Sequence, residues 1–163
     1  MHRADFRQKF GAVYEHSAWI ADNVFDRGGN GFLSDPDAMI VCFESEFMAT
    51  GADVQLAVLR AHPELACARA EHGLLSNASR NEQSGAGLDQ CTEDEFAEFS
   101  KLNAAYRNKF GFPFIIAVKG RARAEILDIM GQRLNNDPET EFNTALEQVC
   151  RIARFRVEEI IDG

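Results

Sequence analysis

His62 is followed directly by Pro63, and this pair has the clearest chemical potential in the chain. Proline fixes its own backbone torsion and moves the preceding residue away from the helical conformation. We therefore expect His62 to be extended at the start of a helix over residues 64–69, with Pro63 in its first turn. An imidazole beside free helical N–H groups suits acid–base chemistry on an anionic ligand. The alternative is a plain turn, because most such dipeptides are only structural.

A polar segment over residues 79–83 is the second candidate for chemistry. It offers a hydroxyl, a carboxylate and a carboxamide from Ser79, Glu82 and Gln83, and small residues follow that would let backbone approach a ligand closely. We expect a loop over residues 77–87. Alternatively, Ser79 caps a helix with Glu82 as its capping-box partner, and such a helix N-terminus would itself bind anions.

Arg156 is the third candidate. Apolar residues recur at helical spacing before and after it: Phe142, Leu146, Val149, Ile152, Ala153 and Ile160. Arg156 falls inside this apolar stripe, whereas Arg151 and Arg154 point elsewhere. An arginine on an apolar face needs a counter-charge. It either pairs with a neighbouring Asp or Glu, or it forms a bidentate clamp for a substrate carboxylate or ureido oxygen.

Composition excludes several classes of function. The 163 residues suit a single domain, residues 1–163, that buries a core without metal or disulfides. A net charge of −9 argues against nucleic acid and anionic membrane as partners, and we find no segment of membrane-spanning length. Cys42, Cys67, Cys91 and Cys150 are scattered, so we expect neither a metal site nor a disulfide framework, and a reduced, cytoplasmic protein.

The elements that must position these residues are mainly helical. Helices are expected over residues 4–11, 17–27, 36–48, 53–60, 93–110, 121–135 and 138–160. Asp35, Thr92 and Asp137 stand at helix starts as caps, and Gly111 stands just past a helix end. Residues 112–118 form a dense apolar run containing a proline, and a lone strand would have no partner. The prediction is an all-α, single-domain helical bundle with one buried extended segment near residues 112–118.

Three central motifs together carry a resemblance to a known family: His62-Pro63-Glu64-Leu65-Ala66, Ser79-x-x-Glu82-Gln83-x-x-Ala86-Gly87-Leu88 and Phe110-Gly111-Phe112-Pro113-Phe114-Ile115. The chain resembles the OHCU decarboxylases, cofactor-free enzymes of urate breakdown. They convert 2-oxo-4-hydroxy-4-carboxy-5-ureidoimidazoline (OHCU) to (S)-allantoin and CO2. The resemblance extends over nearly the whole chain, with Ala18 where a proline is usual and Val157 in place of a common leucine.

The resemblance implies an all-helical, cofactor-free protein, and members of the family are commonly homodimers. It implies that His62 is the catalytic acid or base and that Glu82 orients it. It implies that a small ureidoimidazoline substrate contacts these residues: Pro63, Ser79, Arg80, Asn81, Glu82, Gln83, Phe112, Phe114, Ile115, Ile116, Ala117, Val118 and Arg156.

Two other functions remain open on sequence grounds. The first is a non-catalytic helical binder of ureide-like ligands on the same fold, since fold does not determine function. The second is an enzyme that acts on a related oxidised purine or ureide in the same site. The joint presence of His62, Glu82, Gln83 and Arg156 favours the catalytic interpretation.

Overall fold

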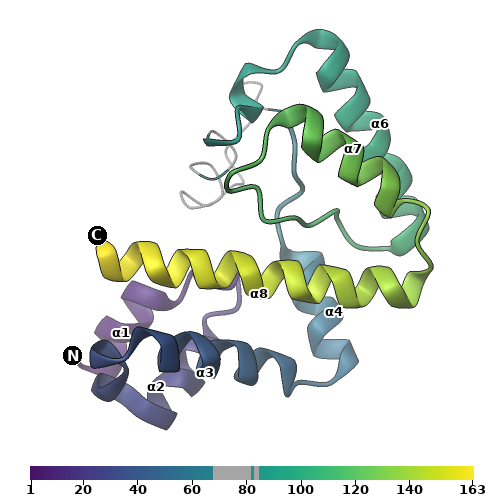
Figure 1. Cartoon of the computed structure of the whole chain (residues 1–163). Helices are drawn as coiled ribbons and strands as arrows, with labels where there is room; N and C mark the ends of the chain where they lie inside the picture. The colour runs from purple at the N-terminus through teal and green to yellow at the C-terminus, as the bar shows by residue number, and fades with distance from the viewer. Residues whose placement is uncertain (68–81, 83–84) are drawn as a thin grey trace. The chain divides into compact units, whose positions relative to one another are not determined.

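Helices dominate the computed structural model, which describes residues 1–67, 82 and 85–163. No β-strand occurs among these residues, so the all-α prediction is confirmed. The helices are α1 (Arg3–Phe10), α2 (Trp19–Gly28), α3 (Pro36–Met48), α4 (Ala52–Ala61), α6 (Glu93–Phe110), α7 (Arg123–Arg133) and α8 (Pro138–Asp162), with 3₁₀ helices η1 (Gly29–Ser34) and η2 (Leu88–Gln90) (Figure 1). None of the described helices has the length and apolarity needed to cross a membrane.

The chain divides into two compact units. Unit 1 comprises residues 1–61 and 149–163, and unit 2 comprises residues 62–148. The expected single domain over residues 1–163 therefore stays a prediction. Unit 2 contains most of the candidate site, and unit 1 contains Arg156.

Helix starts and ends follow the capping residues that the sequence indicates. Asp35 Oδ1 accepts the Ala38 N–H at 3.0 Å at the start of α3. Thr92 Oγ1 accepts the Glu95 N–H, and Glu95 accepts the Thr92 N–H, both at 3.1 Å, so the predicted capping box of α6 is confirmed. Gly111 ends α6 with a φ of 77°, a left-handed conformation that glycine adopts without a steric penalty.

The core of unit 1 is built from aromatic rings. Phe6 and Phe10 of α1 lie with ring centroids 4.6 Å apart, and Tyr14 lies 5.0 Å from Phe47 of α3. The Tyr14 hydroxyl also contacts Cys150 Sγ of α8 at 3.8 Å. Burial, followed by the nearby Cys150, raises the pKa of Tyr14 well above its ordinary value. Its hydroxyl therefore stays protonated as part of the core.

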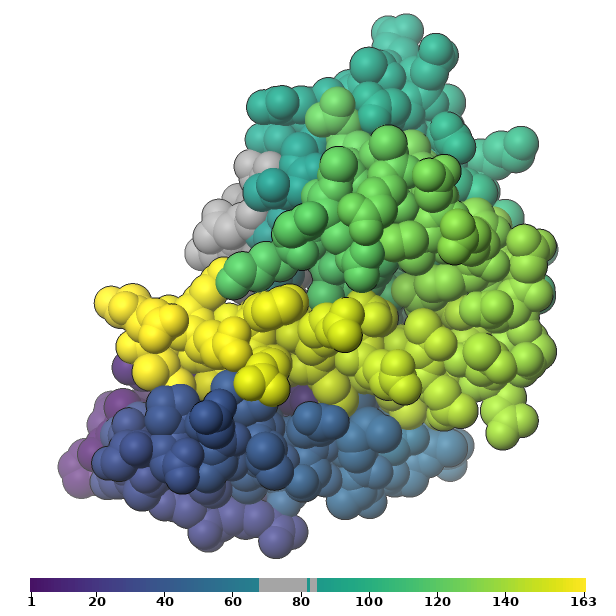
Figure 2. Space-filling view, viewed as in Figure 1, coloured from purple at the N-terminus to yellow at the C-terminus, as the bar shows by residue number. Residues whose placement is uncertain are grey.

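The exposed side of unit 1 is formed in part by α3 and α4, whose side chains make a continuous blue surface in Figure 2. Val41 of α3 is 62% exposed, and Val54 of α4 is also exposed. Single exposed apolar residues are usual on folded proteins and call for no special explanation.

The buried extended segment of unit 2 matches the prediction. Residues 112–118 are non-helical and buried throughout, and Figure 1 draws them as a coil between α6 and α7. Tyr106 of α6 packs against this segment, with its ring centroid 5.9 Å from Phe112 and 5.3 Å from Phe114. The segment is therefore anchored by its aromatic side chains rather than by strand pairing.

One expected helix is wrong over its first residues. Helix α4 ends at Ala61, and residues 63–67 have no helical structure. Pro63 therefore does not stand in a helical first turn, and His62 does not face a helix N-terminus at residues 64–67. Residues 68 and 69 lie outside the described residues. The contacts that replace the helix come from α6 and from Cys91, which follows η2.

Candidate active site

The predicted site residues fall into three groups. His62, Pro63, Glu82 and residues 112–118 belong to unit 2, and Arg156 belongs to unit 1. The remaining predicted residues, Ser79, Arg80, Asn81 and Gln83, lie outside the described residues, as does most of the expected loop over residues 77–87.

His62 directly follows the last residue of α4 and is half-buried. Its Nδ1 lies 3.1 Å from the carbonyl oxygen of Pro63, and its Nε2 is buried. A carbonyl oxygen can only accept a hydrogen bond, so this contact places the proton of a neutral imidazole on Nδ1. The lone pair is then on Nε2, which makes Nε2 the atom suited to take up a proton.

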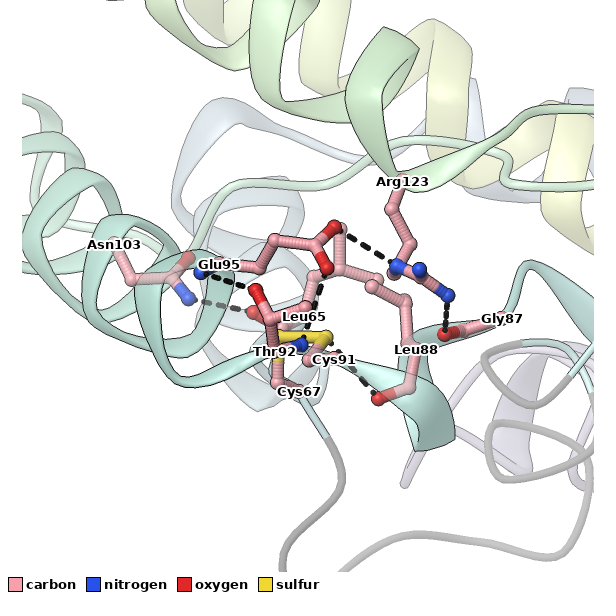
Figure 3. Close-up of a disulfide and its surroundings, with 9 residues drawn as sticks. All are labelled: Leu65, Cys67, Gly87, Leu88, Cys91, Thr92, Glu95, Asn103 and Arg123. Carbon is pink, nitrogen blue, oxygen red and sulfur yellow. Dashed lines mark hydrogen bonds and ion pairs between the residues drawn. A yellow bond between two sulfur atoms is a disulfide. The ribbon is translucent and has the colours of Figure 1, made fainter.

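Helix α6 holds the segment that follows His62. Asn103 Nδ2 donates to the Leu65 carbonyl at 2.5 Å, and Arg107 Nε donates to the Glu64 carboxylate at 3.2 Å. Asn103 and Arg107 are four residues apart, so they lie on the same face of α6. Figure 3 shows Asn103 pointing from α6 toward Leu65. These contacts hold residues 63–67 against α6, which explains why the segment does not form a helix.

A disulfide joins Cys67 to Cys91, with a Cα–Cα distance of 5.8 Å (Figure 3). The expectation that the chain has no disulfide is therefore wrong. The two cysteines are 24 residues apart in sequence, and sequence spacing does not reveal that their segments meet. Cys42 and Cys150 take part in no disulfide. The expectation of a reduced compartment relied on scattered cysteines and loses that support.

Arg123 of α7 holds the chain near Gly87. Its Nη1 donates to the Gly87 carbonyl at 2.8 Å, and its Nε donates to Glu95 at 2.9 Å (Figure 3). Gly87 has a φ of 77°, a left-handed conformation that favours glycine, and a Cβ there would lie 3.0 Å from Arg123 Nη1. The hydrogen bond from Arg123, followed by that from the Thr92 N–H, lowers the pKa of Glu95.

Glu82 lies between these two anchored positions in the sequence. It is helical and half-buried, and its carbonyl accepts the Ala86 N–H at 3.2 Å. The disulfide at Cys67 and the Arg123 contact at Gly87 thus fasten described positions on both sides of Glu82. The helical conformation of Glu82 agrees with the alternative in which a helix begins near Ser79, although Ser79 itself lies outside the described residues.

Three side chains bind the main chain of the buried segment. Arg133 Nη1 donates to the Ile115 carbonyl at 2.7 Å. Gln148 Oε1 accepts the Ala117 N–H at 3.0 Å, and Arg121 Nε donates to the Ala117 carbonyl at 3.1 Å. The Arg133 guanidinium also lies 4.4 Å from the ring centroid of Phe114, a cation–π contact. The carbonyl of Ile115 and both the N–H and the carbonyl of Ala117 are therefore already bonded to protein side chains.

A buried charge network supports Arg133. Its Nε donates to Glu141 at 2.5 Å, the Tyr106 hydroxyl donates to the same carboxylate at 2.6 Å, and Asn136 donates to it at 3.1 Å. Glu141 is fully buried. Burial, followed by the bond to Glu141, raises the pKa of Tyr106 well above its ordinary value. This network was not predicted from the sequence, although Glu141 stands four residues before the buried Ala145, on the same side of α8.

Arg156 is buried on α8, as its position in the apolar stripe predicts. Its Nη2 lies 3.2 Å from Glu15, and its Nη1 donates to the carbonyls of Ala12 and Val13, both at 3.3 Å. The ion pair with a neighbouring acidic residue is therefore present. The contact with substrate that the family resemblance implies stays a prediction.

Comparison with known proteins places the chain in a family. The OHCU decarboxylase family model matches residues 1–158. The chain therefore belongs to the OHCU decarboxylase family. It is 36% identical over 154 residues to a 2-oxo-4-hydroxy-4-carboxy-5-ureidoimidazoline decarboxylase of Haloferax volcanii, covering 94% of this chain and 88% of that protein. It is 33% identical over 161 residues to the protein of that name from Mus musculus, covering 99% and 89%.

Longer relatives and solved structures agree with this assignment. The uric acid degradation bifunctional protein PucL of Bacillus subtilis is 37% identical over 93% of this chain, and the chain spans only 29% of its length. A crystal structure of (S)-allantoin synthase matches with a TM-score of 0.76 and 30% identity, over 99% of this chain and 52% of that one. An OHCU decarboxylase crystallised in the presence of (S)-allantoin matches over both whole chains, with a TM-score of 0.71 and 21% identity, which shows the shared fold.

Proposed function

We propose that this chain catalyses the cofactor-free decarboxylation of OHCU to (S)-allantoin and CO2 in urate breakdown. Its relatives with nearly equal length bear the name of this decarboxylase. The observation that carries the proposal is the orientation of His62, whose Nδ1 faces the Pro63 carbonyl and whose Nε2 is thereby the basic atom. This histidine matches the catalytic position that the family resemblance implies.

The substrate supplies its own electron sink. It carries a carboxylate and a hydroxyl on one carbon, next to a conjugated ring C=N. When the bond to the carboxylate breaks, CO2 leaves and the electron pair enters the ring system. Overall, one proton is then taken up from solvent. The enzyme has to hold the carboxylate out of the ring plane, stabilise the enolate-like intermediate and direct one proton to one face of the ring.

His62 is proposed as the acid–base group, because neutral Nε2 can accept the hydroxyl proton and the resulting imidazolium can return one. Glu82 is proposed to orient the imidazole. The ring is proposed to be held by Ser79, Gln83 and the main chain of residues 114–118. Four further residues are proposed to lie beside it: Pro63, Arg80, Asn81 and Phe112. Arg156 is proposed to balance negative charge that develops as CO2 leaves.

The assembly and compartment are also proposals. A homodimer follows from the family resemblance, and a net charge of −9 disfavours nucleic acid and membrane as partners. The sequence predicts that the protein is located in the cytoplasm. In that reducing compartment the Cys67–Cys91 bond would have to form or persist, although disulfides are uncommon there.

Turnover of freshly generated OHCU, followed by circular dichroism, tests the function. Spontaneous decay yields racemic allantoin, so an optical signal that grows in proportion to enzyme concentration requires a protein-directed proton. A chain that binds (S)-allantoin in calorimetry but produces no optical signal would instead be a non-catalytic ureide binder. Absence of both turnover and binding would contradict the proposal altogether.

A further inference from the structure

The side chains that bind residues 112–118 contact alternate residues. Arg133 reaches the Ile115 carbonyl, whereas Gln148 and Arg121 reach the N–H and the carbonyl of Ala117. In an extended chain the N–H and C=O of one residue point to one side, and those of the next residue point to the other. Ile115 and Ala117 therefore present their main chain to one edge, which the protein occupies.

The main-chain N–H and C=O of Ile116 lie on the opposite edge of the segment. This residue is buried, and within residues 1–67, 82 and 85–163 no group donates to or accepts from its main chain. Buried N–H and C=O groups are almost always paired in folded proteins. An N–H and a C=O side by side on one residue match an amide-rich planar molecule, which can bind them in the way that an added strand pairs with a sheet edge.

We propose that Gln148 is a positioning residue: by holding the Ala117 N–H it turns the main chain of Ile116 toward the substrate. The inference deepens the proposed function and depends on it, because the substrate is the ureidoimidazoline ring. Gln148 acts on the substrate only through the orientation of the peptide units between residues 115 and 117. Arg133 and Arg121 bind main-chain carbonyls on the same edge as Gln148.

The substitution Gln148→Met tests this role, because methionine has a similar length but offers no comparable acceptor for the Ala117 N–H. Loss of one hydrogen bond that aligns the substrate predicts a rise in KM, and in the Kd for (S)-allantoin, of about tenfold, with little change in kcat. Gln148→Glu keeps an acceptor oxygen and should restore the Kd for allantoin, which is a neutral ligand. Gln132→Met, at an exposed position of α7, is the matched control.

Several outcomes decide the matter. A normal KM and a normal Kd in folded Gln148→Met, measured beside an active wild-type enzyme, would overturn the positioning role and leave the decarboxylase function intact. A wild-type chain with neither turnover nor allantoin binding would overturn both. If Gln148→Met fails to fold, Arg121→Met removes the other contact to Ala117 and should raise KM in the same way; an unchanged KM there would contradict the inference.

Discussion

Arg156 on α8 and Glu15, between α1 and α2, form a buried ion pair in which Nη2 lies 3.2 Å from Oε1 and each side chain is 3% exposed. Such a pair is costly to break, because the remaining charge stays buried without compensation. The pair also holds Arg156 in a defined position through contacts with the carbonyls of Ala12 and Val13. Its contributions to stability and to catalysis can be measured separately.

Glu15→Gln should lower the free energy of unfolding by about 3 kcal/mol, because the Arg156 charge loses its buried counter-charge. Urea denaturation at neutral pH measures the change. Asp37→Asn is the matched control, since Asp37 pairs with Arg154 at 3.8 Å on the exposed surface. Surface pairs contribute little, so this control should change stability by less than about 0.5 kcal/mol. Equal losses in the two variants would contradict the importance of burial.

Arg156→Lys should raise KM for OHCU by about tenfold or more, because lysine cannot form the bidentate contact available to a guanidinium. Steady-state kinetics at a temperature where the variant is fully folded measures this effect. A variant that loses stability but keeps the wild-type KM would assign Arg156 to the fold alone and remove it from the substrate contacts.

His62→Asn should reduce kcat by a factor of about 10² to 10⁴, the usual contribution of a positioned acid–base group. Asparagine is polar and close in size, so the protein should remain folded, which circular dichroism in the far ultraviolet checks. His2→Asn, at the exposed N-terminus, is the control and should retain full activity. Turnover close to wild type in folded His62→Asn is incompatible with the assigned role.

Reduction of the Cys67–Cys91 bond should lower the free energy of unfolding by about 3 kcal/mol, as expected when a loop of this length is released. Alkylation of the unfolded protein without reductant should label Cys42 and Cys150. The same alkylation after reduction should label all four cysteines. The double variant Cys67→Ala/Cys91→Ala should be insensitive to reductant. Labelling of all four before reduction would show that the bond is absent in solution.

Glu95 should make the free energy of unfolding depend on pH. Its folded-state pKa lies below the ordinary value of 4.5, chiefly because Arg123 donates to the carboxylate. This stabilisation is fully present above the unfolded pKa and disappears as the pH falls through the folded pKa. Wild type should therefore be more stable than Glu95→Gln at pH 7, and the difference should shrink on acidification. Denaturation at several pH values checks the trend; a difference that grows in acid would have the wrong sign.

Local features of the fold could be predicted because the residues that determine them are close in sequence. The capping box of Thr92 and Glu95 spans four positions, and Gly111 ends α6 through its own backbone conformation. The buried segment over residues 112–118 was predictable from its dense apolar composition. The burial of Arg156 followed from helical periodicity in the same way.

Features that depend on distant residues could not be predicted. The Cys67–Cys91 bond and the Arg133–Glu141 pair join separate elements, and no local pattern reports such meetings. The expected helix at residues 64–67 failed for the same reason: Asn103, far along the sequence, binds the Leu65 carbonyl and holds the chain out of a helix. Local propensity is a weak guide where tertiary contacts compete.

Helix α6 also determines which changes of chain length the protein tolerates. Asn103, Tyr106 and Arg107 lie within about one turn, and they hold the segment after His62 on one side and the buried aromatic segment on the other. One inserted or deleted residue between Thr92 and Asn103 would turn all three by about 100° relative to the cap. Substitutions on the exposed face of α6 should therefore be frequent in evolution, while insertions and deletions in its first half should be rare.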